Sequence, residues 1–416
     1  MRVIRHSANT LRDALLSDNP PLQKLFEEYT VVERTLLCQA FQADGSIFHP
    51  ITIHSPSDWI PSHPEPAESF KDFYYKSSRR VPTSKRKTIY VQTIGPFGDD
   101  DVCTHRYIGW LKGYCQAFFY GLPVKIQGPI PVSETGCAFR INDMTQNLQI
   151  HAGDLLKYLK QVKPDDALCI VGATMIDLYP RDSWNFVFGT ASLTEGVGVF
   201  SFARYDDDFY SPGYKGRLKQ RVKLVDEGYS VFEKSYTPPI TSPLLIRSCK
   251  TLTHEIGHMF GIHHCQWLRC VMQGSNHLEE SDRRPLDLCP VCLRKLQSAI
   301  GFKIADRYQV MFPCVLEKVM ITFLTTTSRV TAMTSLRVPS GAAGDFRTLN
   351  AEFIRLDVPS VNPIPVINVS QSENQLTSNL HLLTSVHVAH RGPVPAVNIL
   401  CNLNAKMIGE YCRVDN

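Results

Sequence analysis

The sequence predicts an α/β (α+β) fold in which helices cover a mixed sheet. A strand-like run at 89–95 (IYVQTIG), a helical pattern at 107–121 and a second extended run at 123–132 follow one another. Strand, helix and strand in that order indicate a βαβ unit. The continuous apolar run at 167–179 (ALCIVGATMIDLY) is typical of a central strand that is covered on both faces.

Further elements extend this pattern along the chain. A helix is expected at 152–161, and the stretch 184–205 predicts two extended pieces joined through SLTEG. The clearest helix spans 243–261, where apolar residues such as Leu252 and Ile256 return to one side with helical spacing. Before residue 74, short amphipathic helices, for example at 22–40, alternate with proline-rich links.

The composition limits the classes of protein that the chain can belong to. It has 416 residues, 43% hydrophobic and 20% charged, with a formal net charge of +4. These values are typical of a globular protein and imply no general attraction to nucleic acid or membranes. No apolar run reaches the roughly 18 residues of a membrane helix, and the N-terminus lacks the hydrophobic core of a signal peptide. We therefore expect a monomer in the cytoplasm, with the nucleus as a further location, and no secretion.

Two segments have alternative interpretations. Residues 1–20 resemble an arginine-bearing mitochondrial presequence, but Asp13 and Asp18 interrupt it, which favours a first helix of the fold. The basic stretch 76–88 (KSSRRVPTSKRKT) suits a nuclear-import signal, a nucleic-acid patch or a solvated linker. Since no aromatic residues interleave with its charges, the linker is favoured.

The stretch 253–272 (THEIGHMFGIHHCQWLRCVM) concentrates metal-binding side chains. On a helix, His254 and His258 project from the same face and can reach one Zn²⁺ at about 2.0 to 2.1 Å. Glu255 lies beside them and off the ligand face. This five-residue H-E-x-x-H pattern also occurs in unrelated helices, so it is weak evidence alone.

The residues that follow strengthen the zinc interpretation. Gly261 and His264 complete H-E-x-x-H-x-x-G-x-x-H, and the glycine lets the chain turn sharply to deliver a third histidine. Three histidines leave one position of a tetrahedral zinc open, which is the mark of a catalytic site. A histidine-rich helix end without metal is the alternative. His263 is interpreted as a surface or supporting residue, with competition for the metal as the alternative, and Met272 is interpreted as a packing residue.

The cysteines divide into two groups. Nine of the 13 are scattered singly among apolar neighbours and are interpreted as reduced thiols: Cys38, Cys103, Cys115, Cys137, Cys169, Cys249, Cys314, Cys401 and Cys412. The other four, Cys265, Cys270, Cys289 and Cys292, form two local pairs that suit one tetrahedral structural zinc. A thioredoxin-like redox pair is disfavoured because no βαβ start precedes it, and disulfides are disfavoured in the cytosol.

The pattern H-E-x-x-H-x-x-G-x-x-H-C-x₄-C-x-M with a distal C-x-x-C resembles the archaemetzincins, a metzincin branch of the zinc metallopeptidases. The stretches MIDLYPRDSWNFVFG, FSFARY and MQGSNHLEESDRRPLDLCPVC carry the same resemblance. It extends from Met1 to about Arg307. It implies a metzincin-like catalytic domain with a twisted mixed sheet, an active-site helix and a C-terminal subdomain held by the four-cysteine zinc site. It also implies an antiparallel edge strand beside the substrate cleft, which we assign to 196–203.

We therefore predict three regions. Residues 1–88 form an N-terminal helical and irregular region with a basic linker, and 89–307 form the metzincin-like catalytic domain with its Cys₄ zinc site. Residues 308–416 are rich in Ser, Thr, Val, Pro and Asn without periodic order, and they resemble nothing in the family. We expect them to form a poorly ordered tail.

The resemblance also implies the roles of the site residues. His254, His258 and His264 become ligands of the catalytic zinc, Glu255 becomes the base that activates a zinc-bound water, and the four cysteines hold a second, structural zinc. Two zinc ions per chain follow, with peptides as substrates and aminopeptidase-type action on short peptides, although endopeptidase action stays open. The alternative is a non-catalytic zinc-stabilised interaction protein. Glu255 favours the enzyme, because a structural site has no use for a general base.

Overall fold

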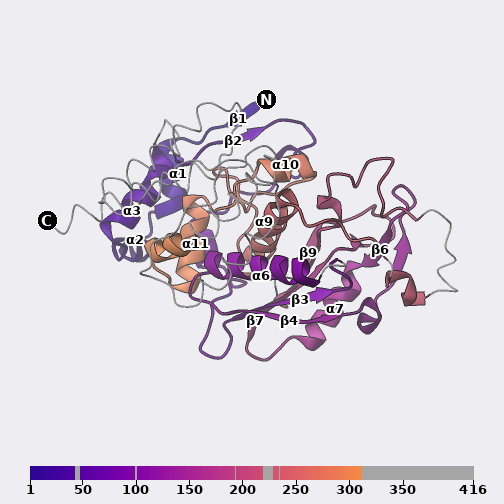
Figure 1. The fold of residues 1–416 in the computed structure, drawn as a ribbon. Coiled ribbons are helices and arrows are strands. Elements are labelled where there is room, and N and C mark those ends of the chain that lie inside the picture. The colour runs from indigo at the N-terminus through magenta and orange to yellow at the C-terminus, as the bar shows by residue number, and fades with distance from the viewer. Residues whose placement is uncertain (43–46, 99–100, 193, 219–227, 234, 312–416) are drawn as a thin grey trace, which may run out of the picture. The chain divides into compact units, whose positions relative to one another are not determined.

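The computed structural model describes residues 1–42, 47–98, 101–192, 194–218, 228–233 and 235–311 (Figure 1). The chain is helical over 304–311. The predicted tail at 308–416 lies outside the described residues except for its first four positions. Among the described residues, no helix is both long and apolar enough to cross a membrane.

A five-stranded mixed sheet with the order β4-β3-β7-β10-β9 forms the centre of the structure (Figure 1). Strand β3 (Thr88–Ile94) pairs in parallel with β4 (Val124–Ile130) and β7 (Ala167–Thr174). Strand β10 (Val197–Ser201) is parallel to β7, whereas β9 (Gly189–Ser192) is antiparallel to β10. The mixed sheet confirms the α/β class that the sequence predicts.

Helices cover both faces of this sheet (Figure 1). Helix α6 (Asp101–Phe118) packs against α9 (Ser242–Met259) on one face, and α7 (Ala152–Val162) packs against β7, β9 and β10 on the other. Alternate strand residues face different helices, as the two-residue period requires. Val91 and Val171 belong to the core beneath α6 and α9, whereas Tyr90 and Ile170 belong to the core beneath α7.

The edge strand predicted at 196–203 is wrong. Strand β10 fills most of this range, and it is an interior strand with β7 on one side and β9 on the other. All five of its residues are buried, whereas those of β9 are half-buried. Gly196 has φ of +64° and its N–H donates to Ser192, so a tight turn returns the chain and leaves β9 at the edge.

The N-terminal segment packs against the C-terminal helix α11 (Pro290–Ile300) through α1 (Ala8–Leu16), α3 (Val31–Cys38) and α5 (Phe70–Tyr74). Leu11 and Leu15 of α1 are buried in the main core, as expected for a first helix of the fold. The remaining elements are β1 (Arg2–Ile4), α2 (Pro20–Glu27), η1 (Gln39–Phe41), β2 (Ile51–Ile53), α4 (Trp59–Ser62), η2 (Val132–Thr135), β5 (Phe139–Ile141), β6 (Leu148–His151), β8 (Asp177–Tyr179), η3 (Ala203–Tyr205), η4 (Gly228–Phe232) and α10 (Leu278–Arg283).

The first part of the basic stretch 76–88 is not the solvated linker that the sequence predicts. Arg79 donates to the carbonyl oxygen of Ser298 at 2.7 Å, and Arg80 donates to the carbonyl oxygens of Leu168 and Thr194 at 3.1 and 3.0 Å. These guanidinium groups satisfy carbonyl acceptors within the fold. Only 83–87 is continuously exposed.

Candidate active site

Helix α9 carries the first two histidines and ends two residues before the motif glycine, Gly261. Thr241 caps its start by accepting the N–H of Leu244, and the helix ends at Met259. Gly261 has φ of +93°, and a Cβ there would lie 3.2 Å from the Cα of Arg79. Both the backbone conformation and the close approach of residue 79 therefore require glycine at this turn.

The turn brings His264 back to the other two histidines. One ring nitrogen from each of His254, His258 and His264 lies within 4.8 Å of the others. The Nε2 atoms of His254 and His258 are 3.0 Å apart, and the ring of His264 is centred 4.8 Å from that of His258. These side chains, chosen from sequence spacing, thus form one cluster.

Hydrogen bonds fix the tautomers of the first two rings. Nδ1 of His254 donates to the carbonyl oxygen of Val271 at 2.9 Å, and Nδ1 of His258 donates to that of Ile262 at 2.7 Å. Burial lowers the pKa of His258 to about 3 and that of His254 well below its usual value, with neighbouring histidines adding to the effect. Both rings are therefore neutral and present lone pairs at Nε2. Two lone pairs aimed together suit a Zn²⁺ ion between them.

The third histidine has a different partner. Nδ1 of His264 lies 3.1 Å from each carboxylate oxygen of Glu65. Trp59 donates its indole N–H to Glu65 at 3.2 Å, and its ring meets His264 edge-on at 4.7 Å between centroids. Sequence reasoning missed Glu65 and Trp59, which stand in a proline-rich link about two hundred positions before His264 and match no local motif.

Glu255 is half-buried beside the histidine cluster and faces the edge of the sheet. One of its carboxylate oxygens lies 3.3 Å from the position that a Cβ would take on Gly189 of β9, so the glycine leaves room for it. Burial raises the pKa of Glu255 to about 7, and the positive charge of Arg284 opposes this shift. Such a carboxylate can both accept and release a proton near neutral pH.

Arg284 is a second residue that sequence reasoning missed. Its side chain is buried and donates to the carbonyl oxygen of Gln273 and to the Ser281 hydroxyl, both at 2.7 Å. Its Nη1 also lies 3.3 Å from Nδ1 of His254. A buried cation is thus held close to both the histidine cluster and Glu255.

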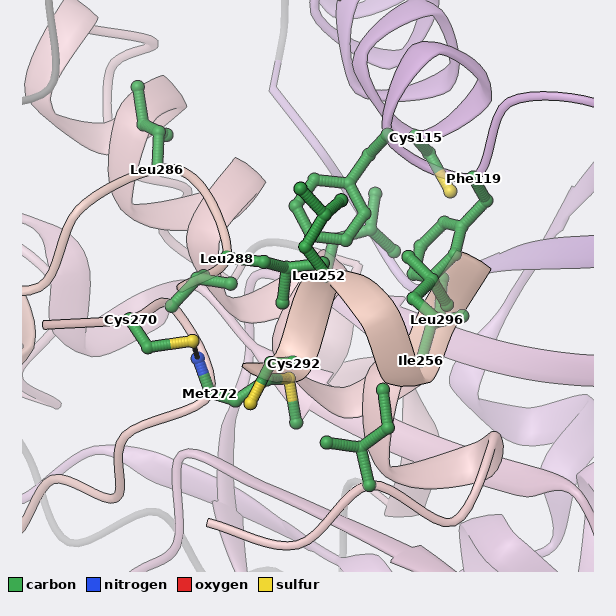
Figure 2. Close-up of a cluster of buried hydrophobic side chains, with 14 of the residues drawn as sticks. Cys115, Phe119, Leu252, Ile256, Cys270, Met272, Leu286, Leu288, Cys292 and Leu296 are labelled. Atoms are coloured by element: carbon green, nitrogen blue, oxygen red, sulfur yellow. Dashed lines mark hydrogen bonds between the residues drawn. The ribbon is translucent and has the colours of Figure 1, made fainter. Parts of the chain in front are cut away.

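Met272 packs against the active-site helix. Its side chain is wholly buried, and a Cβ on Gly257 would come within 2.5 Å of its sulfur. Gly257 stands immediately before His258, so the thioether fills the space that the glycine leaves beside the histidines. Figure 2 shows Met272 next to Cys270, whose Sγ accepts the Met272 N–H at 3.4 Å.

The four clustered cysteines also meet. Their sulfur atoms all lie within 4.8 Å of one another, all four side chains are buried, and none forms a disulfide. The Sγ atoms of Cys265 and Cys289 are 3.5 Å apart, and the N–H of Cys289 points to Sγ of Cys270 at 3.3 Å. Four sulfurs with backbone N–H donors around them suit a tetrahedral zinc.

A lysine accompanies this cysteine cluster. Lys295 is buried on α11, and its ammonium group lies 2.9 Å from a carboxylate oxygen of Glu68. Burial lowers the pKa of Lys295, but the charges of Cys292 and Glu68 outweigh it and leave the pKa raised. Its positive charge offsets part of the negative charge that four thiolates would bring.

His263 lies apart from both clusters. Its side chain is 46% exposed, Nε2 faces the ammonium group of Lys76 at 2.5 Å, and Nδ1 lies 3.5 Å from Glu68. This position agrees with its interpretation as a surface or supporting residue.

Comparisons with known proteins show which proteins this chain is similar to. The model of "Peptidase family M54" matches residues 187–298. Archaemetzincin-2 of Macaca fascicularis is 60% identical over 311 residues, which cover 75% of this chain and 86% of that protein. Archaemetzincin-1 of Homo sapiens is 35% identical over 305 residues, which cover 73% of this chain and 61% of that protein. The crystal structure of an archaemetzincin from Methanopyrus kandleri is 24% identical, with a TM-score of 0.37, covering 53% of this chain and 99% of that chain.

The match to the relative at 60% identity covers most of that protein's length. The chain therefore belongs to the archaemetzincins, the zinc metallopeptidases of family M54.

Proposed function

We propose that this chain hydrolyses short peptides from their amino termini, with Glu255 as the general base. The observation that carries the proposal is the position of Glu255, half-buried between three convergent histidines and the edge strand β9. Burial raises the pKa of this carboxylate to about 7, which suits proton transfer near neutral pH.

His254, His258 and His264 would hold the catalytic zinc, and Cys265, Cys270, Cys289 and Cys292 would hold a structural zinc, giving two ions per chain. When bound at the histidines, zinc lowers the pKa of water towards about 7 and polarises a carbonyl group. The neutral state of His254 and His258 and the Nδ1–H bonds that fix their rings support this assignment.

The protein's own groups would carry the proton and align the substrate. Glu255 takes a proton from the attacking water and passes it to the departing amine. Among the described residues, β9 forms a strand ladder on one side only, with β10. An extended peptide can pair with its other side through main-chain hydrogen bonds, which would place a peptide bond beside Glu255.

The compartment and oligomeric state belong to the same proposal. We place the chain in the cytoplasm, with the nucleus as a further location, as a monomer without nucleic-acid or membrane partners. Cys115, Cys137 and Cys169 are buried and form no disulfide, which suits a reducing compartment.

The preference for a free amino terminus follows from the resemblance to archaemetzincins, and a matched pair of peptides tests it. The zinc-loaded protein is incubated with one short peptide and with its N-acetylated form, and the products are identified by mass spectrometry. We expect stepwise loss of N-terminal residues from the free peptide alone. Internal cleavage of both peptides at similar rates would instead establish an endopeptidase.

A further inference from the structure

The three candidate zinc ligands differ in what holds their second ring nitrogen. His254 and His258 each donate to a neutral backbone carbonyl, whereas His264 meets both oxygens of the Glu65 carboxylate at 3.1 Å. A carboxylate partner orients an imidazole ligand and increases the basicity of its other nitrogen. We infer that Glu65 is a positioning residue that sets both the orientation and the donor strength of His264. This inference rests on the proposed function of the site, in which His264 is a zinc ligand.

Glu65 is itself held in place from several sides. Trp59 donates its indole N–H to the carboxylate, and Gln266 donates to the Glu65 carbonyl oxygen at 2.6 Å. The backbone N–H of Trp59 is bound by Glu280 at 2.8 Å, which ties α4 to α10. Because both the carboxylate and its donor are anchored, Glu65 can hold the His264 ring against rotation.

A second carboxylate three positions later holds the same loop. Glu68 accepts the backbone N–H of His263 at 3.1 Å and pairs with Lys76 at 2.7 Å. Lys76 also donates to the carbonyl oxygen of Gly261 at 3.0 Å. The segment 65–68 therefore contacts the loop between the helix end and Cys265 at two points, through Glu65 at His264 and through Glu68 at His263.

This arrangement places part of the catalytic centre outside the range that the family model matches. Residues 187–298 contain the three histidines and Glu255, but Glu65 and Trp59 precede them by more than one hundred positions. The N-terminal segment therefore contributes directly to the zinc centre and does more than pack against α11.

The test measures metal binding and needs no hydrolysis. Cobalt(II) is titrated into metal-free wild-type, Glu65→Gln, Glu65→Ala and Glu279→Gln protein. The d–d bands of the histidine site are followed separately from the thiolate charge-transfer bands of the cysteine site. Glu279→Gln is the matched control, because Glu279 is 80% exposed and pairs only with Arg283 among the described contacts.

We expect Glu65→Gln to lower affinity at the histidine site about 10-fold and Glu65→Ala about 100-fold, with shifted d–d bands in both. The control and the thiolate bands should not change. Unchanged d–d bands and affinity in both Glu65 variants would overturn the inference. The inference would also be overturned if the loss of affinity paralleled a lower free energy of unfolding and the d–d bands did not shift. That result would indicate a structural role alone. A wild-type protein that binds cobalt at the histidines but cleaves no peptide would refute the proposed function and leave this inference standing.

Discussion

His264 and Cys265 are consecutive residues whose side chains belong to different metal-binding clusters. His264 joins His254 and His258, whereas Cys265 joins the other three cysteines. The backbone N–H of Cys265 donates to the carbonyl oxygen of Met272 at 2.8 Å, which fixes the chain directly after His264. One short loop thus links the two proposed zinc centres.

This link predicts that the cysteine site supports the histidine site. Replacing Cys289 and Cys292 together by serine should weaken zinc binding at the histidines and slow hydrolysis about a hundredfold, because a displacement of about 1 Å costs that much in rate. A chelator titration measures the affinity, and Cys115→Ser, at a buried thiol outside the cluster, is the control. Unchanged affinity at the histidine site in a folded double variant would show that the two centres are independent.

The two clusters predict two zinc ions per chain in fully loaded protein. Elemental analysis of the wild type should give this ratio, and the Cys289→Ser, Cys292→Ser variant should retain one ion. A wild type with a single ion that survives the double replacement would exclude the cysteine site.

The contact between Gly257 and Met272 predicts a steric effect. Gly257→Ala places a methyl group within 2.5 Å of the Met272 sulfur, which is wholly buried and has little room to move. We expect a loss of about 1–3 kcal/mol in the free energy of unfolding, because overpacking a core has this cost. Denaturant unfolding measures it, with Gly113→Ala, where a Cβ meets nothing within 4 Å, as the control. Equal stability of the two variants would contradict the close packing.

Lys250 on α9 predicts a stability that depends on pH. Its side chain is buried, and its ammonium group donates to the carbonyl oxygen of Asp282 at 2.9 Å. Burial lowers the pKa of Lys250 to about 8. The positive charges of Arg284, Arg247 and Arg269 lower this pKa further, and the negative charge of Asp282 opposes the shift. From pH 8 to about 10.5 the unfolded chain holds a proton that the folded chain has released, so folding becomes more favourable as pH rises.

Comparison of wild type with Lys250→Met isolates this effect. Between about pH 7.5 and pH 10, the free energy of unfolding of the wild type should rise by about 2 kcal/mol relative to the variant. Lys85→Met, at an exposed position, should follow the wild type. A constant difference between wild type and Lys250→Met over this range would show that Lys250 keeps an ordinary pKa in the folded protein.

The elements that were predicted well have a strong local signal. The apolar run of β7 and the helical spacing of Leu252 and Ile256 on α9 are properties of neighbouring residues, as is the histidine spacing. The prediction of the edge strand is wrong because the local sequence does not show which of the two extended pieces, β9 or β10, has a partner strand on both sides. The partner that makes β10 the interior strand is β7, which lies earlier in the chain.

The contacts of the N-terminal segment are long-range and leave no trace in local sequence. Glu65 meets His264 across 199 positions, and Arg79 meets Ser298 across 219. An acidic residue in a proline-rich link and an arginine in a basic stretch have many interpretations. Only the fold selects the partners of these side chains.

The most direct test of the proposed mechanism is to measure zinc content and peptide hydrolysis together in Glu255→Gln protein. Glutamine keeps the size of the side chain but cannot take up a proton at neutral pH, and residue 255 is not among the clustered ligands. We predict the zinc content of the wild type and a fall in hydrolysis of about 10²- to 10⁴-fold. Turnover near the wild-type value, or loss of zinc from the histidine site, would contradict the assignment of Glu255 as the base.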